Sequence, residues 1–234
     1  MIMKPPASRG ASAAVALLLL AAAAPALAAP VCDLPATPPE IAVTTEITPP
    51  KFDFSMDRAG LRKRFGEIHL PDPRFYHIDL DRDALMGGRI AATHRVHYVT
   101  EKMKGGRACS SFDRVEVRLS ATPVIYMARE YKKDACEFKE LLVHELKHVE
   151  ADRAVLSLYE GKMRDALRFT FSGQADFSIG PVPAGKLDEA QDALKAGIEG
   201  AVKAMFDNLM RDRMDMQRQI DNIGEYRHLS KACS

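Results

Sequence analysis

The spacing of apolar residues changes once along the chain, and that change constrains the fold more than any other feature. In residues 89–99 and 114–119, apolar and polar side chains alternate, which is typical of half-buried strands. Beyond Lys133 the apolar residues recur at helical spacing, over residues 135–169 and again over residues 186–224. Strands that are followed by helices predict an α+β domain.

The strand patterns predict a small, mostly antiparallel sheet of about four strands. A further alternating segment covers residues 40–47, and residues 123–128 supply the last one. A glycine-rich turn is expected at residues 104–106. Thr122-Pro123 predicts a second reversal, so that the two strands flanking it should form an antiparallel hairpin.

The first 28 residues have the layout of a secretory signal peptide. Lys4 and Arg9 give a positively charged start, an apolar run covers residues 11–24, and small residues at positions 26–28 suit a signal peptidase. The apolar run is short for a membrane span, and no later segment is apolar enough to be one. We therefore expect an exported bacterial protein, periplasmic or secreted, without a stable membrane anchor.

The mature chain is expected to consist of a proline-rich arm, residues 29–50, and a single domain, residues 51–234. Without Lys4 and Arg9, the 33 basic residues of the chain become 31, against 32 acidic ones. A surface so close to neutral gives no reason to expect a nucleic-acid partner or an anionic membrane. The sequence indicates no particular oligomeric state.

Four cysteines follow the signal segment, and an even number in an exported chain predicts two disulfides with three possible connectivities. Cys109 and Cys136 lie symmetrically about the expected reversal at Thr122-Pro123, so a hairpin would bring them level with each other. The sequence therefore predicts the pairs Cys109–Cys136 and Cys32–Cys233.

The segment "LLVHELKHVEAD" holds the residues with the clearest chemistry. His144 and His148 are four residues apart, so on a helix both imidazoles can face one metal ion. Two neutral imidazoles suit Zn²⁺, and an open coordination position leaves room for a water molecule. Glu145 lies beside the first histidine, where a carboxylate can act as general base.

His144, Glu145 and His148 make the chain resemble the zincin metallopeptidases, which carry His-Glu-x-x-His on a helix. The charged Lys147 departs from the usual pattern. The resemblance implies a zinc cofactor, Glu145 as the catalytic base, and a peptide or protein substrate that lies along an edge strand of the sheet. The region from residue 51 onward would then be a zincin-like catalytic domain.

The order of elements also resembles a family of secreted bacterial proteins described as predicted zinc-dependent proteases. Asp221, Tyr226 and His228 match the C-terminal segment of that family loosely, although the threonine and glycine expected there are missing. His228 ranks first as the third zinc ligand and Glu225 second. Asp152 is about 12 Å from His144 along one helix, too far to share an ion with it.

Two other functions fit the same residues. The chain can be a non-catalytic periplasmic protein with a structural or vestigial metal site, or a zinc amidase that acts on cell-wall crosslinks. A structural zinc site has four protein ligands, whereas a catalytic site keeps one position open.

Overall fold

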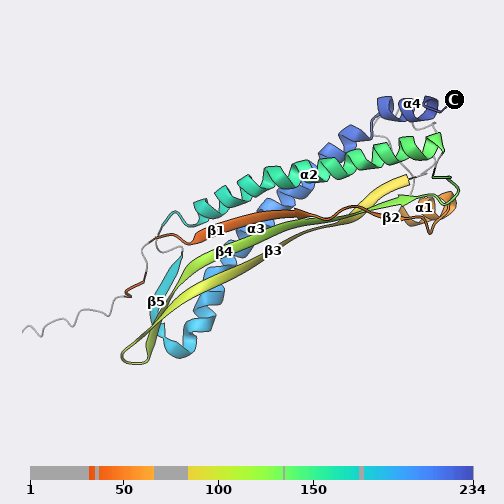
Figure 1. Cartoon of the computed structure of the whole chain (residues 1–234). Coiled ribbons are helices and arrows are strands. Elements are labelled where there is room, and N and C mark those ends of the chain that lie inside the picture. The colour runs from red at the N-terminus through yellow and green to blue at the C-terminus, as the bar shows by residue number, and fades with distance from the viewer. Residues whose placement is uncertain (1–31, 35–36, 66–83, 134, 174–176, 234) are drawn as a thin grey trace, which may run out of the picture. The chain divides into compact units, whose positions relative to one another are not determined.

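In the computed structural model, the described residues are 32–34, 37–65, 84–133, 135–173 and 177–233 (Figure 1). The expected signal peptide, residues 1–28, lies outside these ranges. The α+β prediction is confirmed, because four strands of a five-stranded sheet precede the two long helices and the fifth strand lies between them. Within the described part of the chain, no helix is both long enough and apolar enough to cross a membrane.

A long hairpin forms the centre of the sheet. Strands β3 (Ala84–Met103) and β4 (Arg107–Met127) are antiparallel along their full lengths. The turn between them is the predicted one at residues 104–106, where Gly105 and Gly106 have φ angles of 78° and 70° that favour glycine.

The opposite edge of β4 is occupied by three short strands in succession. Strand β5 (Ser178–Pro183) pairs antiparallel with the start of β4, while β1 (Glu40–Ile47) and β2 (Lys51–Asp53) pair parallel with its middle and end. The sheet is therefore partly parallel and has five strands, where the sequence predicted about four that are mostly antiparallel.

The reversal predicted at Thr122-Pro123 is wrong, because β4 runs straight through it. Proline has no amide hydrogen to donate to a neighbouring strand. Pro123 is tolerated because it lies in the gap between the last residue pair with β1, Ile47–Ala121, and the first pair with β2, Lys51–Val124. On the other edge Pro123 faces Gly88, whose φ is +120°. A Cβ on Gly88 would lie 2.3 Å from the carbonyl oxygen of Thr122, so glycine makes this close approach possible.

The helices follow the predicted positions closely. Helix α2 (Cys136–Thr170) is continuous, and α3 (Leu187–Ile220) follows a 3₁₀ turn at Ala184–Lys186. The second helix was expected to reach residue 224, but it ends at Ile220, and a separate helix α4 (Ile223–Lys231) begins after Asn222. The short helix α1 (Arg58–Phe65) connects the first strands to the segment before β3.

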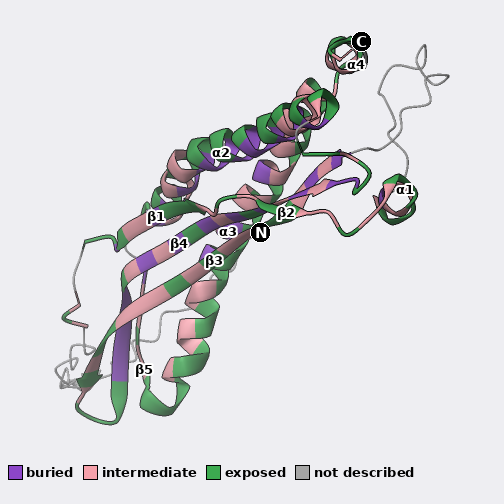
Figure 2. Cartoon of the chain, turned by 45° about the vertical axis from the view of Figure 1, so that its right-hand side comes forward, coloured by how far each residue is buried: buried purple, intermediate pink, exposed green. Residues whose placement is uncertain are grey.

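The two long helices pack on one face of the sheet, and the opposite face is polar. Figure 2 shows buried residues along β4 and along the side of α2 that faces it. In the middle of β4, residues 114–118, the inward valines alternate with charged side chains that point outward. The main core joins β4, α2 and α3 through Val115, Val117, Leu119, Val155, Leu156, Tyr159, Met163, Leu167, Ile198, Val202 and Leu209.

The disulfides join Cys32 to Cys109 and Cys136 to Cys233, so both predicted pairs are wrong. The prediction depended on the absent reversal. Since β4 is one strand, Cys109 lies near its start and Cys136 lies beyond its other end, about 60 Å away at the rise of an extended strand. Cys136–Cys233 instead ties the first residue of α2 to the end of the chain, next to α4.

Replacing Gly88 by alanine should lower the free energy of unfolding by about 1–3 kcal/mol, because the new Cβ would meet backbone atoms at a positive φ. Gly161→Ala is the matched control. That glycine lies inside α2 with no atom within 4 Å of an added Cβ, so alanine should raise the free energy of unfolding by about 0.5–1 kcal/mol. Urea denaturation measures both values, and a Gly88→Ala variant as stable as wild type would contradict the Gly88–Pro123 packing.

Peptide mapping of the non-reduced protein should recover two crosslinked pairs, one that contains Cys32 and Cys109 and one that contains Cys136 and Cys233. Reduction should release all four peptides. Recovery of a peptide that links Cys109 to Cys136 would instead show that the chain reverses near Pro123 after all.

Candidate metal centre

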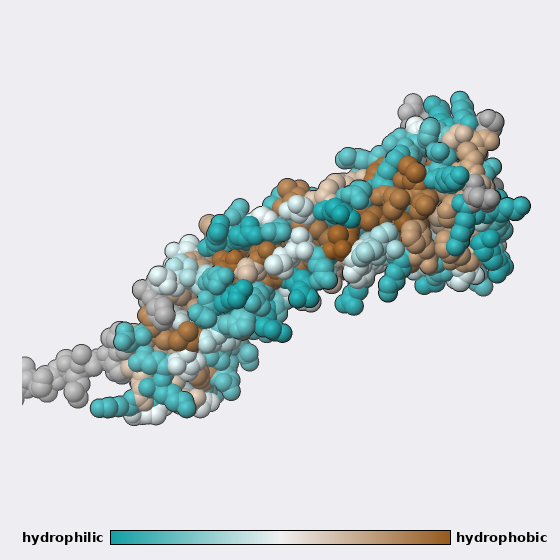
Figure 3. All heavy atoms as spheres, viewed as in Figure 1, coloured by the Kyte–Doolittle hydropathy of each residue, from teal (hydrophilic) through white to brown (hydrophobic). Residues whose placement is uncertain are grey.

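Polar side chains occupy the buried face of the first half of α2. His144, Glu145 and His148 are only 4%, 4% and 6% exposed, whereas their apolar neighbours Val143 and Leu146 are 53% and 37% exposed. Figure 3 shows apolar side chains on the surface over this half of α2. Two apolar residues thus face solvent while three polar ones are buried beside Val149, and a buried polar cluster needs partners to offset its lost hydration.

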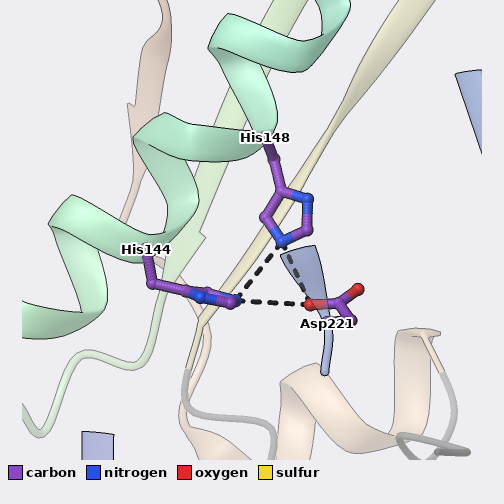
Figure 4. A group of neighbouring side chains, drawn as sticks. All are labelled: His144, His148 and Asp221. Atoms are coloured by element: carbon purple, nitrogen blue, oxygen red, sulfur yellow. Dashed lines mark hydrogen bonds and ion pairs between the residues drawn. The ribbon is translucent and has the colours of Figure 1, made fainter. Parts of the chain in front are cut away.

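The third member of the cluster is Asp221, the residue that follows α3. Its Oδ1 lies 3.3 Å from Nε2 of His144 and 3.1 Å from Nε2 of His148, and the two Nε2 atoms are 3.3 Å apart (Figure 4). Two ligand atoms thus come from one turn of α2, and the third comes from the point where α3 ends.

The spacing of these three atoms fits a zinc ion. Tetrahedral ligands at 2.0–2.1 Å from zinc are separated from one another by about 3.3 Å. Two imidazole lone pairs and a carboxylate oxygen that face one another would also repel, unless a proton or a metal cation lies between them. His144, His148 and Asp221 therefore form a group that can hold a metal ion.

Further hydrogen bonds fix the orientation of each of the three side chains. Nδ1 of His144 lies 3.3 Å from Oε1 of Glu225, which also pairs with Lys147. The Tyr226 hydroxyl donates to Oδ1 of Asp221 over 3.2 Å. Because its Nδ1 hydrogen faces a carboxylate, the lone pair of a neutral His144 lies on Nε2, toward the centre.

The orientation of His148 is fixed in the same way, by a hydrogen bond between its own Nδ1 and Oε1 of Gln217. Both histidines thus turn Nε2 toward Asp221, as metal-binding histidines do when the other ring nitrogen donates a hydrogen bond.

The pKa directions show that the cluster favours positive charge at its centre. Burial lowers the pKa of the His148 imidazole, but the hydrogen bond and charge of Asp221, together with Glu145 and Gln217, outweigh it, so that the pKa is raised overall. Partial burial raises the pKa of Asp221, yet the hydrogen bonds and the electrostatic attraction of His144 and His148 together outweigh it and hold this pKa below its usual range. A metal cation placed between these groups would satisfy the same preference.

Glu145 lies next to the three ligand atoms without being one of them. Burial raises the pKa of its carboxyl group, although the neighbouring His148 and His144 oppose part of this shift. The backbone amide of Met86 in β3 donates a hydrogen bond to the same carboxylate. A carboxylate held in this way, with a raised pKa, is a stronger base than an exposed carboxylate and is suited to accept a proton.

The structure does not bring His228, the first-ranked third ligand, into this group. Its side chain is 63% exposed and its Nε2 lies 3.4 Å from Glu140, so it stays on the surface of α4. Glu225, ranked second, contacts His144 from behind instead of pointing to the centre. Asp152 pairs with Arg213, in line with its expected exclusion as a ligand.

A periodic signal on α3 could have indicated Asp221. Arg213, Gln217 and Asp221 are spaced by four residues, so they lie on one helix face, and all three contact the buried polar residues of α2. A polar stripe of this kind, on a helix that packs against His-Glu-x-x-His, points to the ligand more directly than the nearest histidine does.

Purified wild type should contain about one zinc ion per chain by mass spectrometry, because three ligand atoms are in place. His144→Ala and Asp221→Ala should each lose most of it, whereas His228→Ala should keep it. Zinc that depends on His228 and not on Asp221 would contradict the assignment of the ligands.

Comparison with known proteins gives no relative for this chain. No protein-family model, curated protein or solved structure matches it. The function must therefore be inferred from the side chains of α2, α3 and α4 and from their geometry.

Proposed function

We propose that the chain is an exported zinc-dependent hydrolase that cleaves peptide bonds. His144, His148 and Asp221 would hold the metal, and Glu145 would be the catalytic base. The observation that carries the proposal is the meeting of three ligand atoms beside a buried carboxylate that is not itself a ligand. A structural zinc site would be expected to have a fourth protein ligand, and the described residues offer three.

Zinc bound by these residues would supply a Lewis acid that polarises a carbonyl group and acidifies water. Glu145 would accept a proton from the attacking water and deliver it to the departing amine. Its raised pKa favours this role, because the carboxyl group must hold a proton between the two transfers. Its hydrogen bond from Met86 keeps the carboxylate in place while it does so.

The position of β3 supports an extended substrate. Among the described strands β3 pairs only with β4, so no described strand covers its other edge. The contact between Met86 and Glu145 places this strand beside the proposed base. A peptide added along that edge would bring its backbone carbonyl groups close to the metal centre.

Export of the chain is part of the same proposal. Both disulfides are of the kind that persists in oxidising compartments, and no free cysteine remains among the described residues.

Glu145→Gln should reduce hydrolysis by about 10²–10⁴-fold, because the amide cannot accept the proton, while the zinc content stays at the wild-type level. Glu150→Gln, a change at an exposed position on the same helix, is the matched control and should leave the rate unchanged. The substrates are a mixed library of unstructured peptides and, separately, purified cell-wall peptide crosslinks.

The outcomes separate the possible functions. Cleavage of the crosslinks alone would assign a cell-wall amidase instead of a general peptidase. Zinc-loaded wild type that cleaves neither substrate, or a Glu145→Gln variant as active as wild type, would reject the proposed mechanism and favour a structural site.

A further inference from the structure

The two histidines of the centre differ in the group behind them. His144 faces the carboxylate of Glu225, which Lys147 neutralises, whereas His148 faces the uncharged amide of Gln217. An amide has a donor end and an acceptor end, so it can hold a histidine in the correct tautomer only if it is itself held in one orientation.

The surroundings of Gln217 allow one orientation only. Its Nε2 donates to Oδ1 of Asp152 over 2.8 Å and to the backbone carbonyl of His148 over 3.2 Å. If the amide were turned over, its oxygen would face these two acceptors and lose both hydrogen bonds. Oε1 must therefore point to Nδ1 of His148, which is then the donor.

Asp152 is in turn fixed by an arginine. Its side chain is 3% exposed, and Arg213 binds it through Nε at 2.6 Å and Nη2 at 3.1 Å. A two-point contact of this kind sets the plane of the carboxylate and leaves Oδ1 directed at Gln217. The hydrogen bonds thus run in one series, from Arg213 to Asp152, Gln217 and His148.

We propose that Gln217 is a positioning residue for the metal, and that Asp152 and Arg213 act through it. By accepting the Nδ1 hydrogen of His148, Gln217 keeps the Nε2 lone pair directed at the point where His144 and Asp221 meet. As a neutral group it does so without adding negative charge behind the ligand. The inference rests on the proposed metal site and concerns how that site is kept ready to bind.

The test measures Zn²⁺ affinity in competition with a chelator, using the full-length protein. Gln217→Met removes both hydrogen-bonding ends but keeps a side chain of similar volume. Asp152→Asn keeps the shape but offers one acceptor oxygen in place of two. Asp212→Asn is the matched control, because Asp212 joins α3 to α2 through Tyr159 (2.7 Å) and Lys162 without touching a ligand.

Gln217→Met should weaken zinc binding by about 10- to 100-fold. Asp152→Asn should weaken it as well, and the double variant should bind no more weakly than Gln217→Met alone, because Asp152 acts through Gln217. Asp212→Asn should leave the affinity unchanged. Urea denaturation of every variant separates the loss of metal from the loss of folding.

A second measurement keeps the inference testable if Asp152→Asn does not fold. In zinc-loaded wild type, nitrogen-15 NMR should show slowly exchanging Nδ1 hydrogens for both His144 and His148. In Gln217→Met only the signal of His148 should be lost to exchange with water, while that of His144 remains. If Gln217 had only a structural role, Gln217→Met would not remove the Nδ1 signal of one histidine and leave that of the other.

The inference and the proposed function fail in different ways. Wild type that binds no zinc would reject the metal site itself. Wild type that binds zinc, together with Gln217→Met of equal affinity and an unchanged His148 signal, would reject the positioning role alone. Additive losses in the double variant would show that Asp152 does not act through Gln217.

Discussion

The structure depends on the burial of four polar side chains, His144, Glu145, His148 and Asp152, on the inward face of α2. Buried polar groups without partners cost several kcal/mol in total, so they must be matched from outside the helix. Almost every partner comes from the last turns of α3 or from α4. The packing of α3 against α2 is therefore fixed by polar contacts at this end and by the apolar core elsewhere.

The point at which α3 ends is as important for the position of Asp221 as the packing of α3 against α2. If the helix continued past Ile220, residue 221 would keep its backbone within the helix, and the approach to the histidines would change. Instead Asn222 accepts a hydrogen bond from the amide of Glu225 and starts α4. The new helix presents Glu225 to His144 and Tyr226 to Asp221, and Cys136–Cys233 ties its end to the start of α2.

Local spacing predicted His144, Glu145 and His148, because one helical turn suffices to relate them. The third member of the cluster could not be found in that way, since the position of Asp221 depends on where α3 stops and on how it packs against α2. The prediction of the disulfide pairs was wrong for a related reason. Pro123 usually indicates a turn, but here Gly88 and the gap between β1 and β2 accommodate it within one long strand, which separates Cys109 from Cys136.

Charge balance explains why such a centre can lie in the interior. Arg213 offsets Asp152, and Lys147 offsets Glu225, so these pairs contribute no net charge. Asp221 and Glu145 then remain as two carboxyl groups beside the imidazoles of His144 and His148. Without a metal cation, protons must offset this negative charge, which agrees with the raised pKa values of Glu145 and His148. A single divalent cation would offset both carboxylates at once, and a neutral Gln217 behind His148 preserves that balance where a third unpaired carboxylate would not.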